Sequence, residues 1–169
     1  MLDVHYVHVK WEGPLTRIEA QTRRNSQIDF GVYQVYGAHP LYGSGVLLYI
    51  GKCESLTFGL RFSQHYDWLH GNSDRHNVQI YLGRLHTSGP TPLNTDWERQ
   101  IRQVESLLIY AHGPAANSSG LNKEMGEDFH QLHVLNWGNF RSLLPEVSGA
   151  RYSNRFWNNE QYNPYTTSA

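Results

Sequence analysis

The sequence predicts an α+β fold: a small three-stranded antiparallel sheet flanked by helices in an α/β sandwich, with N- and C-terminal extensions. Two kinds of periodicity indicate this class. Apolar and polar residues alternate as in half-buried strands within residues 29–37, 46–52 and 78–85. Apolar residues recur at helical spacing within residues 57–69 and 95–111. The 169 residues, 39% of them hydrophobic, are enough for the core of one domain.

The first expected element is a helix over residues 14–28, within an N-terminal extension that covers residues 1–28. Pro14 suits a first helical turn, and residues of high helix propensity follow it. Arg23 and Arg24 lie near the end of the segment, where positive charge complements the helix dipole. The extension is therefore predicted to be helical.

Residues 29–37 and 46–52 are expected to pair as an antiparallel hairpin. The nine residues from Gly37 to Gly45 contain many turn formers, which predicts a long loop between the two strands. Because side chains alternate between the faces of a strand, suitable pairing would put Tyr33 and Tyr49 on the same face.

A helix over residues 57–69 is expected after the hairpin. Its Arg61 and His65 are four residues apart and therefore share one face of the helix. A polar loop follows, and residues 78–85 are then expected to add the third strand.

The clearest helix begins at Thr95. Glu98 lies three residues later, and this pair is the signature of a capping box. At 100° per residue, Glu105 falls about 80° from the centre of the apolar stripe, on the border between core and solvent. Gly113 and Pro114 are expected to end the helix. The apolar stripe consists of Trp97, Ile101, Val104, Leu108 and Ala111.

Composition and charge exclude several classes of protein. Cys53 is the single cysteine, so there is no disulfide framework, and we interpret it as a structural thiol. No run of about 18 apolar residues and no signal-peptide pattern is present, so a cytoplasmic protein with no membrane partner is expected. The formal net charge of −1 excludes a uniformly basic nucleic-acid binder, although the cations are 11 Arg against 3 Lys. No Gly-rich phosphate loop is present, which gives no support for a nucleotide cofactor.

Polar residues suited to phosphate chemistry occur in a distinctive order along these elements. Gly31-Val32-Tyr33 on the first strand and Tyr49-Ile50-Gly51 on the second resemble the paired signature of the GIY-YIG nuclease superfamily. The likeness covers about residues 29–122, and in size and layout the chain is most similar to the compact GIY-YIG type II restriction endonucleases. It departs from the pattern in the long hairpin loop and in Val32. The residues that continue the resemblance are Lys52, Arg61, His65, Glu105 and Asn117.

The resemblance implies a Mg²⁺-dependent DNA endonuclease that hydrolyses phosphodiester bonds, with Mn²⁺ able to substitute. It also implies site-specific cleavage of double-stranded DNA of the restriction type by a catalytic core over residues 29–122. Residues 123–169 would form a C-terminal extension for DNA recognition or dimerisation. A palindromic site cut on both strands needs two active sites, so a homodimer is expected.

The chemistry of the reaction supports this set of residues. Attack by water on a phosphodiester needs a base, positive charge around the phosphate and stabilisation of the leaving oxygen. The resemblance implies Tyr33 as general base, with Tyr49 supporting it or exchanging roles. Arg61 can fork onto a phosphate oxygen, and Glu105 is suited to bind one Mg²⁺. A tyrosine is a useful base only if its pKa is lowered, which Lys52, Arg61 and the metal are expected to do.

The remaining roles are less specific. His65 is expected to hold or protonate this network or to contact phosphate, and Asn117 to orient its neighbours through hydrogen bonds. Taken singly, Tyr33 and Tyr49 are also typical strand aromatics, and Glu105 a typical solvated carboxylate. A non-catalytic nucleic-acid-binding module with the same fold is therefore the alternative function. Within the enzyme class, a monomeric structure-selective or nicking nuclease is the other possibility.

Contacts to DNA are expected from residues outside this motif. Arginine suits phosphate and guanine, and asparagine suits adenine. The C-terminal tail also has a structural interpretation, in which Phe156 and Trp157 pack on the core or on a second subunit. The candidate phosphate contacts are Arg23, Arg24, Arg75 and Arg84, and the candidates for base edges are Arg151, Asn154, Arg155, Asn158 and Asn159.

Overall fold

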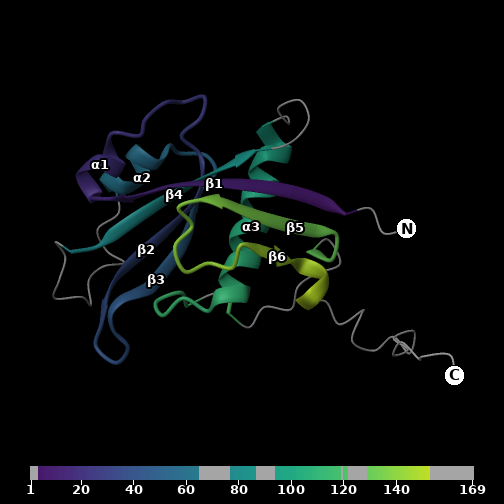
Figure 1. The fold of residues 1–169 in the computed structure, drawn as a ribbon. Helices are drawn as coiled ribbons and strands as arrows, with labels where there is room; N and C mark the ends of the chain where they lie inside the picture. Colours follow the sequence, from purple (N-terminus) through teal and green to yellow (C-terminus); the bar gives the residue numbers. More distant parts are fainter. Residues whose placement is uncertain (1–3, 65–76, 87–93, 119, 122–128, 153–169) are drawn as a thin grey trace, which may run out of the picture.

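The computed structural model describes residues 4–64, 77–86, 94–118, 120–121 and 129–152. This part of the chain folds as one six-stranded sheet with helices on both faces (Figure 1). The strands are β1 (His5–Leu15), β2 (Gly31–His39), β3 (Gly43–Cys53), β4 (Gln79–His86), β5 (Leu132–Gly138) and β6 (Glu146–Ser148). The helices are α1 (Arg17–Gln21), α2 (Phe58–Gln64), α3 (Asn94–His112) and the 3₁₀ helix η3 (Gly149–Tyr152).

The α+β class is confirmed, but the expected sheet of three strands is wrong. The strand order is β3-β2-β4-β1-β5-β6, and β1 runs parallel to β5 while the other neighbours are antiparallel. The three predicted strands correspond to β2, β3 and β4, which lie side by side. β1 continues the sheet because Val7, Val9 and Trp11 alternate with polar residues and bury one face.

The helix expected over residues 14–28 is also wrong. Residues up to Leu15 belong to β1, which pairs with β4, and only the five residues of α1 are helical. The helix begins where it does because Thr16 and Glu19 form a capping box. The Thr16 backbone N–H donates to the Glu19 carboxylate at 2.7 Å, and the Thr16 hydroxyl accepts from the Glu19 N–H.

The hairpin is confirmed, but its loop is much shorter than expected. β2 and β3 pair in antiparallel register as far as His39 and Gly43, so residues 40–42 alone connect them. A bulge absorbs part of the turn-rich segment, because Ala38 lies opposite both Ser44 and Gly45. Glycine is required at Gly45, where φ is +70°.

The later elements follow the sequence prediction closely. Within the described residues, the helix predicted over 57–69 is α2. The helix predicted from Thr95 is α3, but it already includes Asn94, so Thr95 lies inside the helix and is not its N-cap; α3 ends at His112. Gly113 then adopts φ +55°, and its N–H donates to the Ile109 carbonyl at 2.9 Å, as in a left-handed C-terminal cap. None of the described helices has the length and hydropathy needed to cross a membrane.

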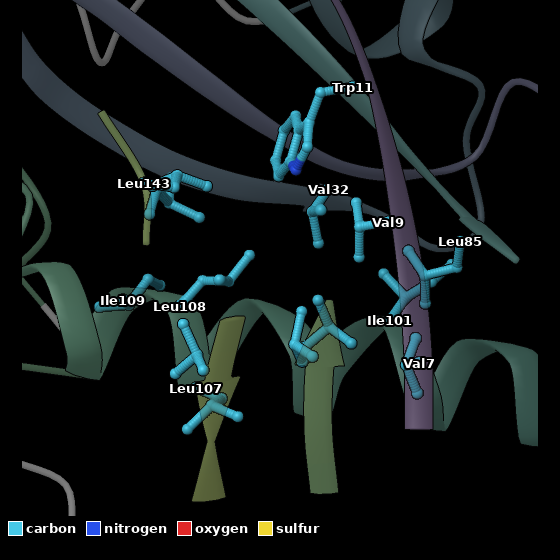
Figure 2. Packing of buried hydrophobic residues seen from close by; sticks show 14 of the residues in the cluster. Val7, Val9, Trp11, Val32, Leu85, Ile101, Leu107, Leu108, Ile109 and Leu143 are labelled. Carbon is cyan, nitrogen blue, oxygen red and sulfur yellow. The ribbon is translucent and has the colours of Figure 1, made fainter. Parts of the chain in front are cut away.

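The sheet separates two hydrophobic layers. On one face, α1 and α2 cover a small cluster that includes Ala20, Phe58 and Tyr33. On the other face, α3 covers a larger cluster, where each fully buried aliphatic side chain stabilises the fold by roughly 1.5–3 kcal/mol. Figure 2 shows this larger cluster, in which Val7, Val9, Trp11 and Val32 of the sheet face Ile101, Leu107 and Leu108 of α3.

Candidate active site

Tyr33 and Tyr49 lie on the same face of the sheet, as expected if the two strands of the hairpin pair in a suitable register. Tyr33 is opposite Gly51, and Tyr49 is opposite Val35, so the tyrosines are diagonal neighbours on β2 and β3. Their rings stack with centroids 6.1 Å apart. A Cβ atom at Gly51 would overlap the Tyr33 ring and lie 2.7 Å from Cε1 of Tyr49. The glycine of the second motif is therefore what allows the two rings to meet.

Arg61 reaches this pair from α2. Its guanidinium lowers the pKa of Tyr33 through a hydrogen bond and through its charge. The next residue, Phe62, packs edge-on against the Tyr33 ring at 5.0 Å. Among the described residues, no carboxylate forms an ion pair with Arg61, and its buried Nε–H has no hydrogen-bond partner. Arg61 is therefore a cation that the described part of the fold leaves uncompensated.

Lys52 and Glu105 form an ion pair on the other side of β3. Lys52 Nζ lies 2.8 Å from Glu105 Oε2, and the Glu105 side chain is 14% exposed. Lys52 is opposite Val32, which belongs to the cluster under α3, whereas Tyr49 packs against the cluster under α1 and α2. The site therefore wraps around β3, which is an edge strand of the sheet.

Burial controls the pKa of both tyrosines. Tyr33 is 0% exposed, and desolvation raises its pKa well above the ordinary value, by more than Arg61 lowers it. Desolvation and then the charge of Glu105 raise the pKa of the half-buried Tyr49, against the opposing effects of Arg61 and Lys52. Arg61 therefore acts on both pKa values, and Lys52 on that of Tyr49, in the expected direction, but desolvation outweighs them and the net shift of each pKa is upward.

Asn117 holds the second tyrosine motif in place. Its Oδ1 accepts a hydrogen bond from the Ile50 N–H, and its Nδ2 donates to the Ile50 carbonyl, both at 3.0 Å. The preceding residues pair with the same strand, because the N–H groups of Ala115 and Ala116 donate to the carbonyls of Leu47 and Leu48. Asn117 thus orients the backbone next to Tyr49, which is the kind of role that the resemblance implies.

Replacing Asn117 with Ala is expected to lower the free energy of unfolding by about 2 kcal/mol or more, because it leaves two buried backbone groups unpaired. Urea denaturation followed by circular dichroism measures the change. Asn139→Ala is the matched control, since Asn139 is exposed and its side chain donates one bond, to the Gly13 carbonyl. Equal stabilities for the two variants would contradict this role of Asn117.

Arg23 and Arg84, two of the expected phosphate contacts, are engaged in ion pairs. Arg23 pairs with Glu12, and Arg84 pairs with Glu12 at 2.8 Å and with the buried Asp29 at 2.6 Å. Arg24 donates to Ser63 Oγ and to a backbone carbonyl of α1. These contacts tie β1, β4 and the loop before β2 together, so they favour a structural role for Arg23 and Arg84.

This network is expected to make stability depend on pH. The hydrogen bond from Arg23 is the main cause that holds the pKa of Glu12 below its ordinary value. The stabilisation is therefore complete above the ordinary pKa and is lost as the pH falls through the lowered one. Melting temperatures between about pH 6 and pH 3 should fall more steeply for the wild type than for Glu12→Gln. Parallel curves would contradict the prediction, and Glu98→Gln on α3 is the control.

A metal ion would find one carboxylate in this site. The described residues contain no group of three or more His, Cys, Asp or Glu side chains that could hold a metal. Glu105 fits Mg²⁺ only as a single ligand, which is how this ion often binds when water and substrate phosphate complete its shell. Cys53 is buried nearby, and burial raises the pKa of its thiol to about 12, in keeping with a structural role.

Several predicted residues lie outside the described part of the chain. Arg151 is the base-edge candidate that lies within the described residues. It belongs to η3 and is exposed. Sequence reasoning missed Phe62, which packs on Tyr33. The helical spacing from Phe58 placed Phe62 on an apolar face but gave no partner for it. The predicted residues outside the described part are His65, Arg75, Asn154, Arg155, Asn158 and Asn159.

Comparison with family models, curated proteins and solved structures finds no match to this chain. The likeness to GIY-YIG nucleases therefore depends on the motif residues and on where the fold places them. Folding brings Tyr33, Tyr49, Lys52, Arg61 and Glu105 to one strand edge.

Proposed function

We propose that the protein is a Mg²⁺-dependent DNA endonuclease of the GIY-YIG type. One observation carries the proposal: a base candidate, two cations and a carboxylate converge from β2, β3, α2 and α3 on the edge of the sheet at β3. Hydrolysis of a phosphodiester uses this combination of groups. The residues concerned are Tyr33, Tyr49, Lys52, Arg61 and Glu105.

Arg61 is the group that would bind the scissile phosphate. Its planar guanidinium can donate two parallel hydrogen bonds to phosphate oxygens, which an ammonium cannot do. No carboxylate among the described residues competes for it. Lys52 is paired with Glu105, so its main role in the proposal is to orient that carboxylate.

Tyr49 is the better candidate for the general base in this geometry. A general base must come within hydrogen-bond reach of the attacking water, and Tyr33 is fully buried whereas Tyr49 is half-buried. This reverses the roles that the resemblance implies. Tyr33 would then support Tyr49 by stacking against it and by holding Arg61.

Glu105 would hold Mg²⁺, which supplies positive charge against the phosphate during hydrolysis. Burial raises the pKa of Tyr49, so positive charge added in the phosphate-bound state would be needed to ease loss of its proton and let it act as a base. Arg61 and Lys52 already act in that direction.

Double-strand cleavage of the restriction type extends the proposal to two copies of the chain. The described part contains one such constellation, and a twofold homodimer provides the second active site that a palindromic duplex requires. The arginines and asparagines after residue 150 are the candidates for reading bases.

A non-catalytic nucleic-acid-binding module is the second candidate, and two observations favour it. The Glu105 carboxylate is already compensated by Lys52, and burial raises the pKa of both tyrosines. A binding module needs neither a free carboxylate nor a basic phenolate. Arg61 would then serve as a phosphate contact without catalysis.

Incubation with a supercoiled plasmid of mixed sequence tests the proposal. Purified protein is added with Mg²⁺, with Mn²⁺ and with EDTA, and the products are resolved on a gel. Discrete fragments with the metal ions alone support a restriction-type enzyme, and a smear or a nicked circle supports a less selective nuclease. An intact plasmid under all conditions, together with retarded migration, favours the binding module and overturns the nuclease.

A further inference from the structure

A second polar site lies near the turn of the β2–β3 hairpin. It is a cavity of about 210 Å³ beside the bulge at Ser44 and Gly45. Its polar lining comes from Ser44, Asn77, Gln79 and Arg141. The candidate active site uses none of these residues.

Arg141 is held in a defined orientation over this cavity. Its guanidinium lies 4.1 Å from the centre of the Tyr36 ring, and Nη1 donates to Gln79 Oε1 and, at 3.4 Å, to the Tyr81 hydroxyl. Because these contacts involve the aromatic face and Nη1, the Nε and Nη2 donors have no hydrogen-bond partner among the described residues. The Gln79 oxygen is occupied by Arg141, which leaves its amide nitrogen as a donor.

The backbone at Arg141 is strained. Its φ of 52° is the single positive value among the non-glycine residues that the structure describes. The residue lies in a turn closed by a hydrogen bond from the Leu143 N–H to the Phe140 carbonyl, and Ser142 bonds the Tyr36 hydroxyl at 2.7 Å. A positive φ at the second residue of such a turn is costly for arginine, and it fixes the direction in which the Arg141 side chain leaves the backbone.

The charge and the size of the cavity define its ligand. No carboxylate is among the described residues that line it, and Arg141 forms no ion pair with any of them. The pocket therefore presents one oriented cation and several neutral hydrogen-bond donors. Its volume is below the range of roughly 300–1,000 Å³ that sites for larger organic ligands occupy. A single tetrahedral anion matches both properties.

We infer that this cavity binds a phosphate group through Arg141. Tyr36 and Val32 belong to the same cluster under α3, and Val32 is paired with Lys52 of the candidate active site. The cavity and the candidate active site therefore both draw residues from the β2–β3 hairpin. A phosphate of the nucleic acid bound at the candidate active site is therefore the expected occupant. This identification of the source rests on the proposed nuclease function, whereas the phosphate chemistry rests on the cavity alone.

Nuclear magnetic resonance titration tests the inference. The amide signals of Ser44 and Gly45 and the Nε signal of Arg141 are followed while inorganic phosphate, or in a second arm a short DNA duplex, is added in EDTA. We expect both probes to shift these signals in the wild type. Arg141→Asn should weaken phosphate binding by at least about tenfold while keeping the fold, because Asn tolerates positive φ. Arg99→Asn is the matched control, because Arg99 is 65% exposed and lies on α3.

Each outcome has a distinct meaning. Shifts with phosphate but not with the duplex support the phosphate site and overturn nucleic acid as its source. No shift in the wild type, or equal affinity in Arg141→Asn, overturns the inference. Arg141→Lys is a second variant, which keeps the positive charge but loses the planar guanidinium with its paired N–H donors. It should bind phosphate more weakly than the wild type. An uncut plasmid with shifted Ser44 and Gly45 signals leaves this site standing and overturns the nuclease alone.

Discussion

Replacing Glu105 with Gln is expected to lower Mg²⁺-dependent plasmid cleavage by at least about a hundredfold, because the site loses the carboxylate that the described residues offer to a metal, and Lys52 loses its partner. Glutamine keeps the size of the side chain and can still accept a hydrogen bond from Lys52 Nζ at the same oxygen. The change therefore removes the charge with little change in packing. Initial rates of loss of supercoiled plasmid measure the effect.

Two variants separate a metal-binding role from simple pairing. Glu98→Gln, on the same helix, should cleave at the wild-type rate. Lys52→Met removes the other partner of the ion pair. This variant should keep part of the Mg²⁺-dependent cleavage, because Glu105 stays in place. Wild-type cleavage by Glu105→Gln, with an unchanged response to EDTA, would contradict the proposed role of Glu105.

Replacing Tyr49 with Phe is expected to reduce cleavage by about 10²–10⁴-fold, the usual contribution of a general base. The physical reason is exposure, since Tyr49 is half-buried and Tyr33 is fully buried. Phenylalanine keeps the stacked ring at the 6.1 Å centroid distance and removes the hydroxyl alone. Single-turnover rates at several pH values measure both the size of the effect and the loss of the group that titrates.

Tyr33→Phe is the comparison variant for this prediction. It should reduce cleavage less and should leave the pH profile in its wild-type form, because Tyr33 then acts through Arg61 and Tyr49. Abolished cleavage in Tyr33→Phe with near-normal cleavage in Tyr49→Phe would restore the roles that the resemblance implies. Thermal melts of both variants separate loss of chemistry from loss of the fold.

Local patterns predicted the elements whose periodicity or end residues lie within their own segment of sequence. β2, β3 and β4 follow from alternation, and α3 follows from its apolar stripe and from the Gly113 stop. The amino-terminal strand was missed although Val7, Val9 and Trp11 alternate with polar residues. The residues of high helix propensity after Pro14 led to the prediction of a helix instead. Pairing of β1 with β4 and β5 outweighed this helix propensity.

The motif residues were found from their types and order, but their roles depend on partners that no spacing predicts. Arg84 was expected to contact phosphate, and it meets Asp29 and Glu12 from distant segments. Arg141 had no sequence signal, since it follows a region without periodicity, and its contacts come from β2 and β4. Contacts of this kind join segments that are close together in the fold and far apart in the chain.

The sequence by itself determined the α+β class, the two tyrosine motifs and the order of cations and carboxylate around them, because periodicity and residue type are local properties. Tertiary structure alone decided that Tyr49 is accessible while Tyr33 is buried. It also decided that Arg84 is paired with Asp29 and Glu12, while Arg61 has no carboxylate partner among the described residues. The reason is that solvent exclusion and charge pairing depend on which segments pack together, and desolvation then sets the pKa of each group.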